Sequence, residues 1–287
     1  MIQTAAVIGA GRAGRSLALS LTGTSCRLDF IVDPAPFNLP VDCPSYTGLS
    51  DVSQTVDLLL ICVPDREIIT VLRELAEHPQ LQHTTVLHLS GASNLSPYEN
   101  LAQHSFRGFG MLHPLYSFPQ LATTMPEKLL YSINGDEVGL SAARELCLLL
   151  QGQTIVVRQE KAVLYHALAV IMSNFPQALA IMTAELSSEV TPDADEQMLL
   201  RRGLQALLLQ SVAGQSPANP AAELTGPARR GDVNTIRAHL RELKQRDENL
   251  MDLYLRFSQI ILHLNEKEIP ASLITECQQS LEEYKTR

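Results

Sequence analysis

Three polar side chains lie within a long apolar segment, residues 161–186, and their spacing could support proton transfer. His166 and Ser173 are seven residues apart. On an α-helix, which turns about 100° per residue, they lie about 20° apart on one face, and Asn174 lies about 80° further round. Polar groups in an apolar helix are costly unless they are paired or line a site. The cluster indicates either an internal hydrogen-bond network or a substrate site, and we favour the site.

Other side chains could exchange a proton or stabilise charge. His113, in GMLHPLYSF, stands between an apolar run and a proline, where an imidazole could serve a carbonyl or alcohol near neutral pH, or could simply bond to backbone. Ser90 and Gly91, in HLSGA, could polarise a substrate oxygen, although a plain turn explains them equally. Lys161 lies about 140° round the helix from His166, so a solvated lysine is the simpler interpretation.

A glycine-rich loop near the start of the chain has the pattern of a phosphate cradle. The segment VIGAGRAGRSL follows a buried apolar run and precedes an amphipathic helical pattern. Gly9 would allow the tight turn, Gly11 the close approach of backbone to a pyrophosphate, and Gly14 the packing of helix on strand. Arg12 and Ala13 complete the loop, and the phosphates would lie against the N-terminus of the helix. A glycine-rich turn without a ligand is the alternative.

The positions after the next strands bear on the cofactor. Asp33 directly follows the strand LDFIV. It stands about 20 residues after the loop, where an acidic group binds the adenosine ribose. A carboxylate favours NAD, because it repels a 2′-phosphate, whereas Arg12 could favour NADP, so the choice stays open. Val63 and Pro64, in CVPD, should flank the cofactor, because ligands bind at the C-terminal ends of parallel strands.

A last polar block, LTGPARRGD, lies in the second half of the chain. Arg230 and Thr225 are its best candidates for binding a substrate carboxylate. Asp232 is a candidate N-cap for the helical pattern that follows. A capped turn would explain most of this block.

The elements that must position these residues fall into two halves. Up to residue 157, short apolar runs alternate with helical patterns, which predicts a doubly wound parallel sheet of the Rossmann-like α/β class. Strands are expected at 4–10, 27–32, 56–63, 84–90, 104–112, 129–135 and 153–157. Further on, the periodicity is helical. We therefore predict a dinucleotide-binding domain over 1–157 and an all-α domain over 158–287, which binds substrate and forms a homodimer through its apolar helix.

Composition excludes several classes of protein. A net charge of −9 argues against nucleic acid as a partner, because phosphate binding requires a basic face. No uninterrupted apolar run approaches the roughly 18 residues of a membrane span, and no signal peptide is evident, so we expect no membrane partner and a cytoplasmic protein. The five cysteines lack a CxxC pair and the eight histidines lack ligand spacing, so we expect no metal.

Six segments together resemble one family. VIGAGRAG, LLLICVPDREI, VLHLSGA, GMLHPLYSF, KAVLYHALAVIMSNF and LTGPARRGD occur in this order in Rossmann-like proteins with a DUF2520 C-terminal domain, and the resemblance spans nearly the whole chain. That family is similar to the 6-phosphogluconate-dehydrogenase-like group, which includes ketopantoate, pyrroline-5-carboxylate and prephenate enzymes. The resemblance supports His113, through the HP segment of prephenate dehydrogenases, and Lys161, through a catalytic lysine of related reductases. The stretch VDPAP departs from the family's serine and basic residue, which weakens an NADP preference.

The resemblance implies an NAD(P)-dependent oxidoreductase that moves a hydride to or from a small oxo or hydroxy acid. Ketopantoate (2-dehydropantoate) is the first candidate substrate. A non-catalytic dinucleotide-binding sensor and a dehydrogenase of cyclic or amino-acid substrates, of the prephenate or pyrroline-5-carboxylate type, are the alternatives. The catalytic candidates are His113, His166, Asn174, Ser90 and Lys161, and the substrate-binding candidates are Ser173, Thr225 and Arg230.

Overall fold

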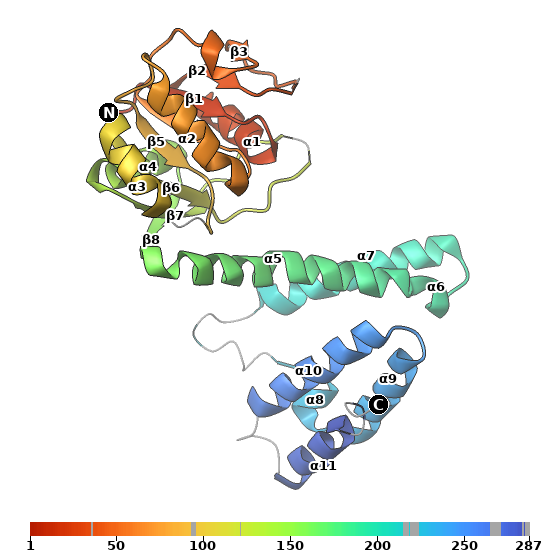
Figure 1. Cartoon of the computed structure of the whole chain (residues 1–287). Coiled ribbons are helices and arrows are strands. Elements are labelled where there is room, and N and C mark those ends of the chain that lie inside the picture. The colour runs from red at the N-terminus through yellow and green to blue at the C-terminus, as the bar shows by residue number, and fades with distance from the viewer. Residues whose placement is uncertain are drawn as a thin grey trace. The chain divides into compact units, whose positions relative to one another are not determined.

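The computed structural model describes residues 1–35, 37–92, 96–120, 122–214, 218, 224–264, 271–282 and 284. The chain divides into two compact units, Met1–Phe175 and Pro176–Arg287. The first unit holds an eight-stranded sheet in the order β3-β2-β1-β4-β5-β6-β7-β8 (Figure 1). Its strands are β1 (Thr4–Ile8), β2 (Arg27–Val32), β3 (Ser45–Tyr46), β4 (Leu58–Ile61), β5 (Thr85–His88), β6 (Gly108–Pro114), β7 (Leu130–Gly135) and β8 (Gln153–Val156).

The direction of the strands confirms the predicted fold class and adds one feature. Neighbouring strands are parallel from β3 to β6, whereas β7 pairs antiparallel with β6 and parallel with β8. Because β1 lies between β2 and β4, the chain reverses its winding there, and this switch point is where such sheets bind ligands. All seven expected strands are present. The two-residue strand β3 was not expected, because so short a strand carries no periodic pattern.

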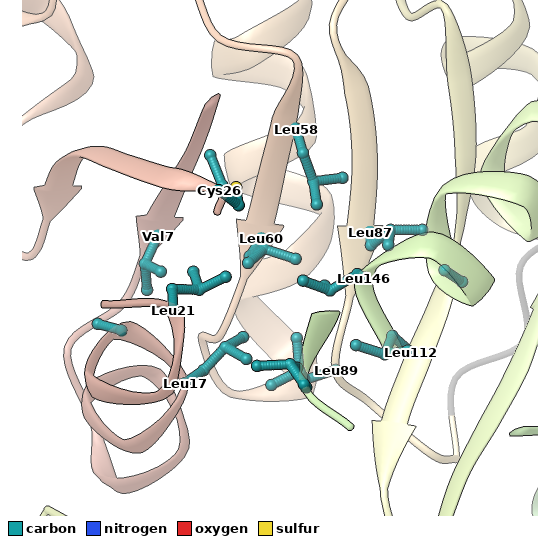
Figure 2. Close-up of a cluster of buried hydrophobic side chains, with 14 of the residues drawn as sticks. Val7, Leu17, Leu21, Cys26, Leu58, Leu60, Leu87, Leu89, Leu112 and Leu146 are labelled. Carbon is teal, nitrogen blue, oxygen red and sulfur yellow. The ribbon is translucent and has the colours of Figure 1, made fainter. Parts of the chain in front are cut away.

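Side chains alternate between two cores, one on each face of the sheet. In β4, Leu58 and Leu60 belong to one buried cluster, and Leu59 and Ile61 belong to the other. The period of two follows from the pleat of a strand. The first core is closed by α1 (Arg12–Leu21) and α4 (Glu137–Leu149), and the second by α2 (Ile68–Glu77) and α3 (Ser96–Ser105). Figure 2 shows the first core, with Leu17 and Leu21 of α1 and Leu146 of α4 pointing toward strand side chains.

Helices make up the rest of the described chain. They are α5 (Ala162–Glu185), α6 (Ser187–Val190), α7 (Ala194–Ala213), α8 (Pro227–Arg230), α9 (Val233–Lys244), α10 (Glu248–Leu264) and α11 (Ala271–Glu282). The last four share a core around Ile236, Leu255 and Cys277. The Asp232 side chain accepts a hydrogen bond from the Thr235 backbone N–H at 3.2 Å, which confirms this residue as the N-cap of α9.

Helix α5 bears on the expectation that the chain has no membrane span. The segment Gln159–Val190 contains an 18-residue stretch with a mean hydropathy of 1.5, and it is long and apolar enough to cross a membrane by length and composition, the one such segment among the residues that the structure describes. His166, Ser173 and Asn174 interrupt the apolar run, but the mean hydropathy of the stretch around them stays high. Helices that soluble proteins bury in a core or an interface can have the same length and apolar composition.

The boundary between the halves can be located in two ways. The sheet ends at Val156 and helices follow from Ala162, whereas the two compact units divide at Phe175, within α5. The division comes later because Tyr165 and His166, in the first turn of α5, contact His113 of the sheet. The domain boundary at residue 157 stays a prediction.

Candidate active site and dinucleotide cradle

One cleft in the first unit gathers several of the expected site residues. It has a volume of about 650 Å³ and is bounded by the end of β6, the chain that follows it, and α5. We call it the His113 cleft. Its lining residues are His113, Pro114, Leu115, Tyr116, Ser117, Leu130, Ile155, Tyr165, His166, Leu168, Ala169, Val170, Met172, Ser173 and Asn174. The structure therefore brings His113 to the predicted cluster of His166, Ser173 and Asn174.

His113 is held by its neighbours on three sides. Its Nδ1 lies 3.0 Å from the Tyr165 hydroxyl oxygen, and the two rings meet edge to face with centroids 5.6 Å apart. The His166 ring lies 5.9 Å away by the same measure. Gly91 allows the ring to lie close, because a Cβ at that position would be 2.8 Å from the imidazole. A hydrogen-bonded ring packed against glycine has few rotamers open to it, so His113 is preorganised.

The environment keeps His113 uncharged near neutral pH. Burial, with a smaller effect of His166, lowers the pKa of His113 to about 4, and Asp65 opposes the shift. Burial raises the pKa of the Tyr165 phenol, while the Ser132 hydroxyl opposes that shift. At neutral pH the pair therefore consists of a neutral imidazole and a protonated phenol. Such a pair can donate a hydrogen bond to a substrate oxygen and exchange a proton with it.

Tyr165 is the residue that the sequence interpretation missed. It stands next to His166 in an apolar helix, and a tyrosine in such a segment is usually read as core. The only available signal was this adjacency, since both residues begin the helix that enters the cleft. Its partner is 52 residues away in the chain, and no local pattern reports a pairing of that range.

The other polar groups of the cleft lie further along α5. The Ser173 hydroxyl donates to the Ala169 carbonyl at 2.7 Å, and it lies 2.8 Å from Oδ1 of Asn174. Both side chains line the cleft, and Asn174 is exposed. The Asn174 amide can thus bind a polar group of a ligand, while its neighbour is satisfied within the helix.

A second histidine, His88, lies buried beside the site. It ends β5, is fully buried, and packs against the rings of Tyr98 and Phe109 with centroids 6.4 and 5.7 Å away. Neither ring nitrogen has a hydrogen-bond partner among the residues described. Burial, with a smaller effect of His113, lowers the pKa of His88 to about 3.

The two depressed pKa values predict acid lability of the fold. The unfolded chain protonates each histidine near the ordinary value of 6.5, whereas the folded protein resists protonation. Each proton taken up below that pH therefore favours unfolding, and stability is lost as the pH falls from 6.5 toward 4 for His113 and toward 3 for His88. The slope is at most about 1.4 kcal/mol per pH unit for each histidine. Urea denaturation of His88→Leu at pH 7, 6, 5 and 4 should show a shallower decline than the wild type. Identical slopes for the two proteins would contradict this prediction.

The glycine loop has the geometry of a cradle for a dinucleotide. Gly9 has a φ of +97°, and a Cβ there would lie 2.8 Å from the Cys62 carbonyl oxygen, while a Cβ at Gly14 would lie 1.9 Å from the Gly9 carbonyl oxygen. These two glycines are therefore required by the fold itself. Gly11 is different, because a Cβ there would meet no atom within 4 Å. It leaves open space at the N-terminus of α1, where the first turn has no acidic residue.

Asp33 is tied to this loop. Its carboxylate accepts hydrogen bonds from the backbone N–H of Ala10 at 2.5 Å and of Ala35 at 2.8 Å. It thus positions the loop, and it keeps further lone pairs for ribose hydroxyls. Arg12 is exposed at the start of α1, and its side chain makes no ion pair with any residue that the structure describes.

The remaining expected cofactor residues lie in α1 and after β4 and β5. Val63 packs beside Gly9, with its Cγ1 3.0 Å from where a Cβ of that glycine would lie. Pro64 is exposed and precedes the short 3-10 helix η2 (Asp65–Glu67), and Ser90 is buried just after β5. Ala13 is half-buried in α1. The arrangement fits a dinucleotide, since the loop is open where backbone must approach phosphate and its carboxylate is preoriented.

Four expected catalytic or substrate-binding residues do not line the cleft, and one of them is Ser90, which is buried just after β5. Lys161 is exposed at the end of the 3-10 helix η3 (Gln159–Lys161) and does not line it. Thr225 and Arg230 are exposed residues of the second unit. Among the described residues, no group of three His, Cys, Asp or Glu side chains could hold a metal ion. The roles of all these residues stay predictions.

Solved structures with similar folds support the architecture. A protein of Bacteroides fragilis that is provisionally named an NADP oxidoreductase is 20% identical, with a TM-score of 0.72, covering 91% of this chain and 98% of that chain. A protein of Thermotoga maritima is 24% identical, with a TM-score of 0.65, covering 92% and 99%. Pyrroline carboxylate reductase of Plasmodium falciparum, determined with NADP bound, is 10% identical, with a TM-score of 0.56, covering 98% and 97%. At these identities the likeness shows the fold.

Comparison of the sequence adds a domain assignment. Among curated proteins, none matches the chain significantly. Residues 129–261 match the model of the domain of unknown function DUF2520, so the matched segment begins with β7 in the sheet rather than at residue 158. The chain therefore combines a Rossmann-like sheet with a DUF2520 domain over residues 129–261.

Proposed function

We propose that this protein is an NAD(P)-dependent oxidoreductase that transfers a hydride to or from a small oxo or hydroxy acid. The observation that carries the proposal is the neutral His113 imidazole, within hydrogen-bond distance of Tyr165 in a cleft of about 650 Å³. The same sheet carries a glycine loop that is open at Gly11. The names of the relatives from Bacteroides fragilis and Plasmodium falciparum agree with this reaction class.

The chain's own residues would bind, orient and protonate. The N–H groups around Gly11 would hold the pyrophosphate, and Asp33 the adenosine ribose. A bound nicotinamide dinucleotide supplies the hydride. His113 would hold the substrate oxygen by a hydrogen bond and exchange its proton, with His166 beside it. Apolar residues such as Pro114 and Leu130, which line the cleft and are buried or half-buried, would exclude water and strengthen that hydrogen bond.

The substrate that we propose first is ketopantoate. The amide of Asn174 and the hydroxyl of Ser173 offer neutral polar contacts to an oxo acid, and Arg230 and Thr225 are the candidates for its carboxylate. The decisive experiment is a panel of ketopantoate and pyrroline-5-carboxylate with NADH and NADPH, and of prephenate with NAD and NADP, followed by absorbance of the reduced cofactor. Turnover of prephenate or pyrroline-5-carboxylate in place of ketopantoate would support the alternative, a dehydrogenase of cyclic or amino-acid substrates. Tight dinucleotide binding with no turnover of any member would instead support the non-catalytic sensor.

The cofactor preference can be tested through two residues. The Asp33 carboxylate would repel a 2′-phosphate, and the exposed Arg12 guanidinium would attract one. We expect the wild type to bind NADH more tightly than NADPH. Asp33→Asn should narrow the difference by about tenfold, or about 1.4 kcal/mol, and Arg12→Ala should widen it, both measured by calorimetric titration. Equal ratios in all three proteins would show that neither residue selects the cofactor.

A second copy of the chain is the partner that we propose for the apolar surface of α5 and α7. A membrane is less suitable, because α7 shares a groove with α5 and presents Arg201 and Gln205 to it, and a charge inside a bilayer is costly. Light scattering of the purified protein should give the mass of a homodimer, and a monomer would contradict the proposal. The exposed apolar residues of this surface are Val163, Leu164, Leu168, Ile171, Met172, Phe175 and Ile181 of α5, and Met198, Leu199, Leu207, Leu209 and Val212 of α7.

All five cysteines are free thiols, which suits a reducing compartment and supports a cytoplasmic location.

A further inference from the structure

We propose that Tyr165 is the source of the proton that His113 hands to the substrate oxygen, and that it acts by holding His113 in the tautomer with its proton on Nε2. The inference rests on the proposed function for the identity of the reaction. The direction of the hydrogen bond and the tautomer of His113 rest on the contacts within the His113 cleft. Tyr165 would be a positioning residue, since it acts on the substrate through His113.

The geometry of three side chains carries the proposal. The Tyr165 hydroxyl oxygen lies 3.0 Å from Nδ1 of His113, with the rings edge to face at 88°. Ser132 lies directly opposite His113 in the antiparallel pair β6 and β7. Both side chains therefore point to the same face of the sheet. The Ser132 side chain is fully buried, and its oxygen has no hydrogen-bond partner among the residues described. The Ser132 hydroxyl lies near enough to lower the pKa of Tyr165, so it can donate to the Tyr165 oxygen.

The direction of the hydrogen bond follows from the protonation states. A buried phenol keeps its proton, because burial raises the pKa of Tyr165, and a neutral imidazole offers one bare nitrogen as acceptor. Tyr165 O–H therefore donates to Nδ1 of His113. The second ring nitrogen, Nε2, then carries the proton. Donation in the opposite sense would leave Nε2 bare and unable to donate to a substrate oxygen.

The proton transfer balances without a charged imidazole. During reduction, a bound dinucleotide would supply a hydride, which forms the new C–H bond at the carbonyl carbon, and the C=O π electrons would move to the substrate oxygen and make it negative. The Nε2–H bond of His113 breaks as the new O–H bond forms, while Nδ1 takes the phenolic proton of Tyr165. The products are the hydroxy acid, neutral His113 in its other tautomer, and a Tyr165 phenolate that the Ser132 hydroxyl can stabilise. Solvent then returns a proton to the phenolate, and oxidation follows the reverse path.

The chain contains a second histidine and tyrosine pair that serves as an internal reference. In the second unit, Nδ1 of His239 lies 2.9 Å from the Tyr254 hydroxyl oxygen, with centroids 5.5 Å apart and rings at 81°. The contact geometry matches that of His113 and Tyr165, but His239 is exposed. The same tyrosine-to-phenylalanine change can therefore be made at both pairs.

The test is the tautomer of His113 in the full-length protein without ligand, read from the ¹⁵N shifts of labelled imidazole rings. His113→Gln identifies the His113 signals. The wild type should show a bare Nδ1 and a protonated Nε2 on His113. Tyr165→Phe should give a mixture of tautomers there, and Tyr254→Phe should leave His113 unchanged. A protonated Nδ1 in the wild type, or identical His113 shifts in Tyr165→Phe, would overturn the proposal.

Kinetics separate this inference from the function on which it rests. Tyr165→Phe should lower kcat by about 10²- to 10⁴-fold with little change in KM, and it should remove the alkaline limb of the pH profile of kcat. Unchanged kcat in an active enzyme would overturn the role of Tyr165 while the proposed function stands. A wild type that turns over no oxo acid would overturn both, even with the expected tautomer.

Discussion

His113→Gln should reduce kcat by about 10²- to 10⁴-fold, the usual contribution of a positioned proton donor. The effect is expected because this imidazole, fixed against Tyr165 at 3.0 Å, is the group of the cleft best placed to serve a substrate oxygen. Glutamine retains a polar side chain of similar length but cannot relay a proton between two nitrogens. Steady-state assays with the substrate and cofactor that the panel identifies will measure the change.

The control for this prediction is the same substitution at an exposed histidine. His104→Gln, at the end of α3, changes a side chain whose Nδ1 lies 2.7 Å from the Asn100 carbonyl oxygen, on another element of the sheet domain. It should leave kcat within about twofold, since surface changes of this kind are small. Equal kcat in His113→Gln and the wild type would remove His113 from the mechanism.

The depressed pKa of His113 adds a pH dependence to this first prediction. Burial lowers the pKa of His113 to about 4, so the imidazole stays neutral as the pH falls from 7 to 5. We therefore expect kcat to hold over this interval at temperatures where the protein stays folded. A loss of activity centred near pH 6.5, the ordinary histidine value, would show that the proton carrier is a more exposed group.

Gly11→Ala should weaken dinucleotide binding at least tenfold while leaving the fold intact. A Cβ at Gly11 meets no protein atom within 4 Å, so the folded protein accepts it, but the methyl group would occupy the space where a pyrophosphate approaches the backbone. We expect at least a tenfold loss of affinity for NADH and NADPH, or about 1.4 kcal/mol, with an unchanged Tm. Calorimetric titration and thermal unfolding provide the two measurements.

Alanine substitutions at two other glycines serve as comparisons for Gly11→Ala. Gly14→Ala should prevent normal folding, because its Cβ would lie 1.9 Å from the Gly9 carbonyl oxygen. Gly203→Ala, in α7, also meets no atom within 4 Å, and it should bind dinucleotides as the wild type does. If Gly11→Ala bound NADH and NADPH with wild-type affinity, the loop would be a turn required only by the fold.

Much of the architecture could be predicted because it depends on neighbours in the chain. Buried strands, amphipathic helices and glycine turns each have a local signature, and the seven expected strands are present. The reversed direction of β7 had no such signature, since a strand has the same period whichever way it runs. Its pairing with β6 depends on distant contacts, and this pairing places Ser132 opposite His113.

The sequence by itself determined the sheet, the glycine loop with Asp33 behind it, and the shared helix face of His166 and Ser173, because fixed backbone geometry relates residues close in the chain. Only the tertiary structure decided that His113 meets Tyr165, 52 residues further on, and that Lys161 stays outside the cleft. The tertiary structure alone also decided that the His113 imidazole is neutral and that the Tyr165 phenol keeps its proton near neutral pH. A pKa depends on burial and on groups that folding brings from elsewhere, and these are properties of the packed chain rather than of any segment.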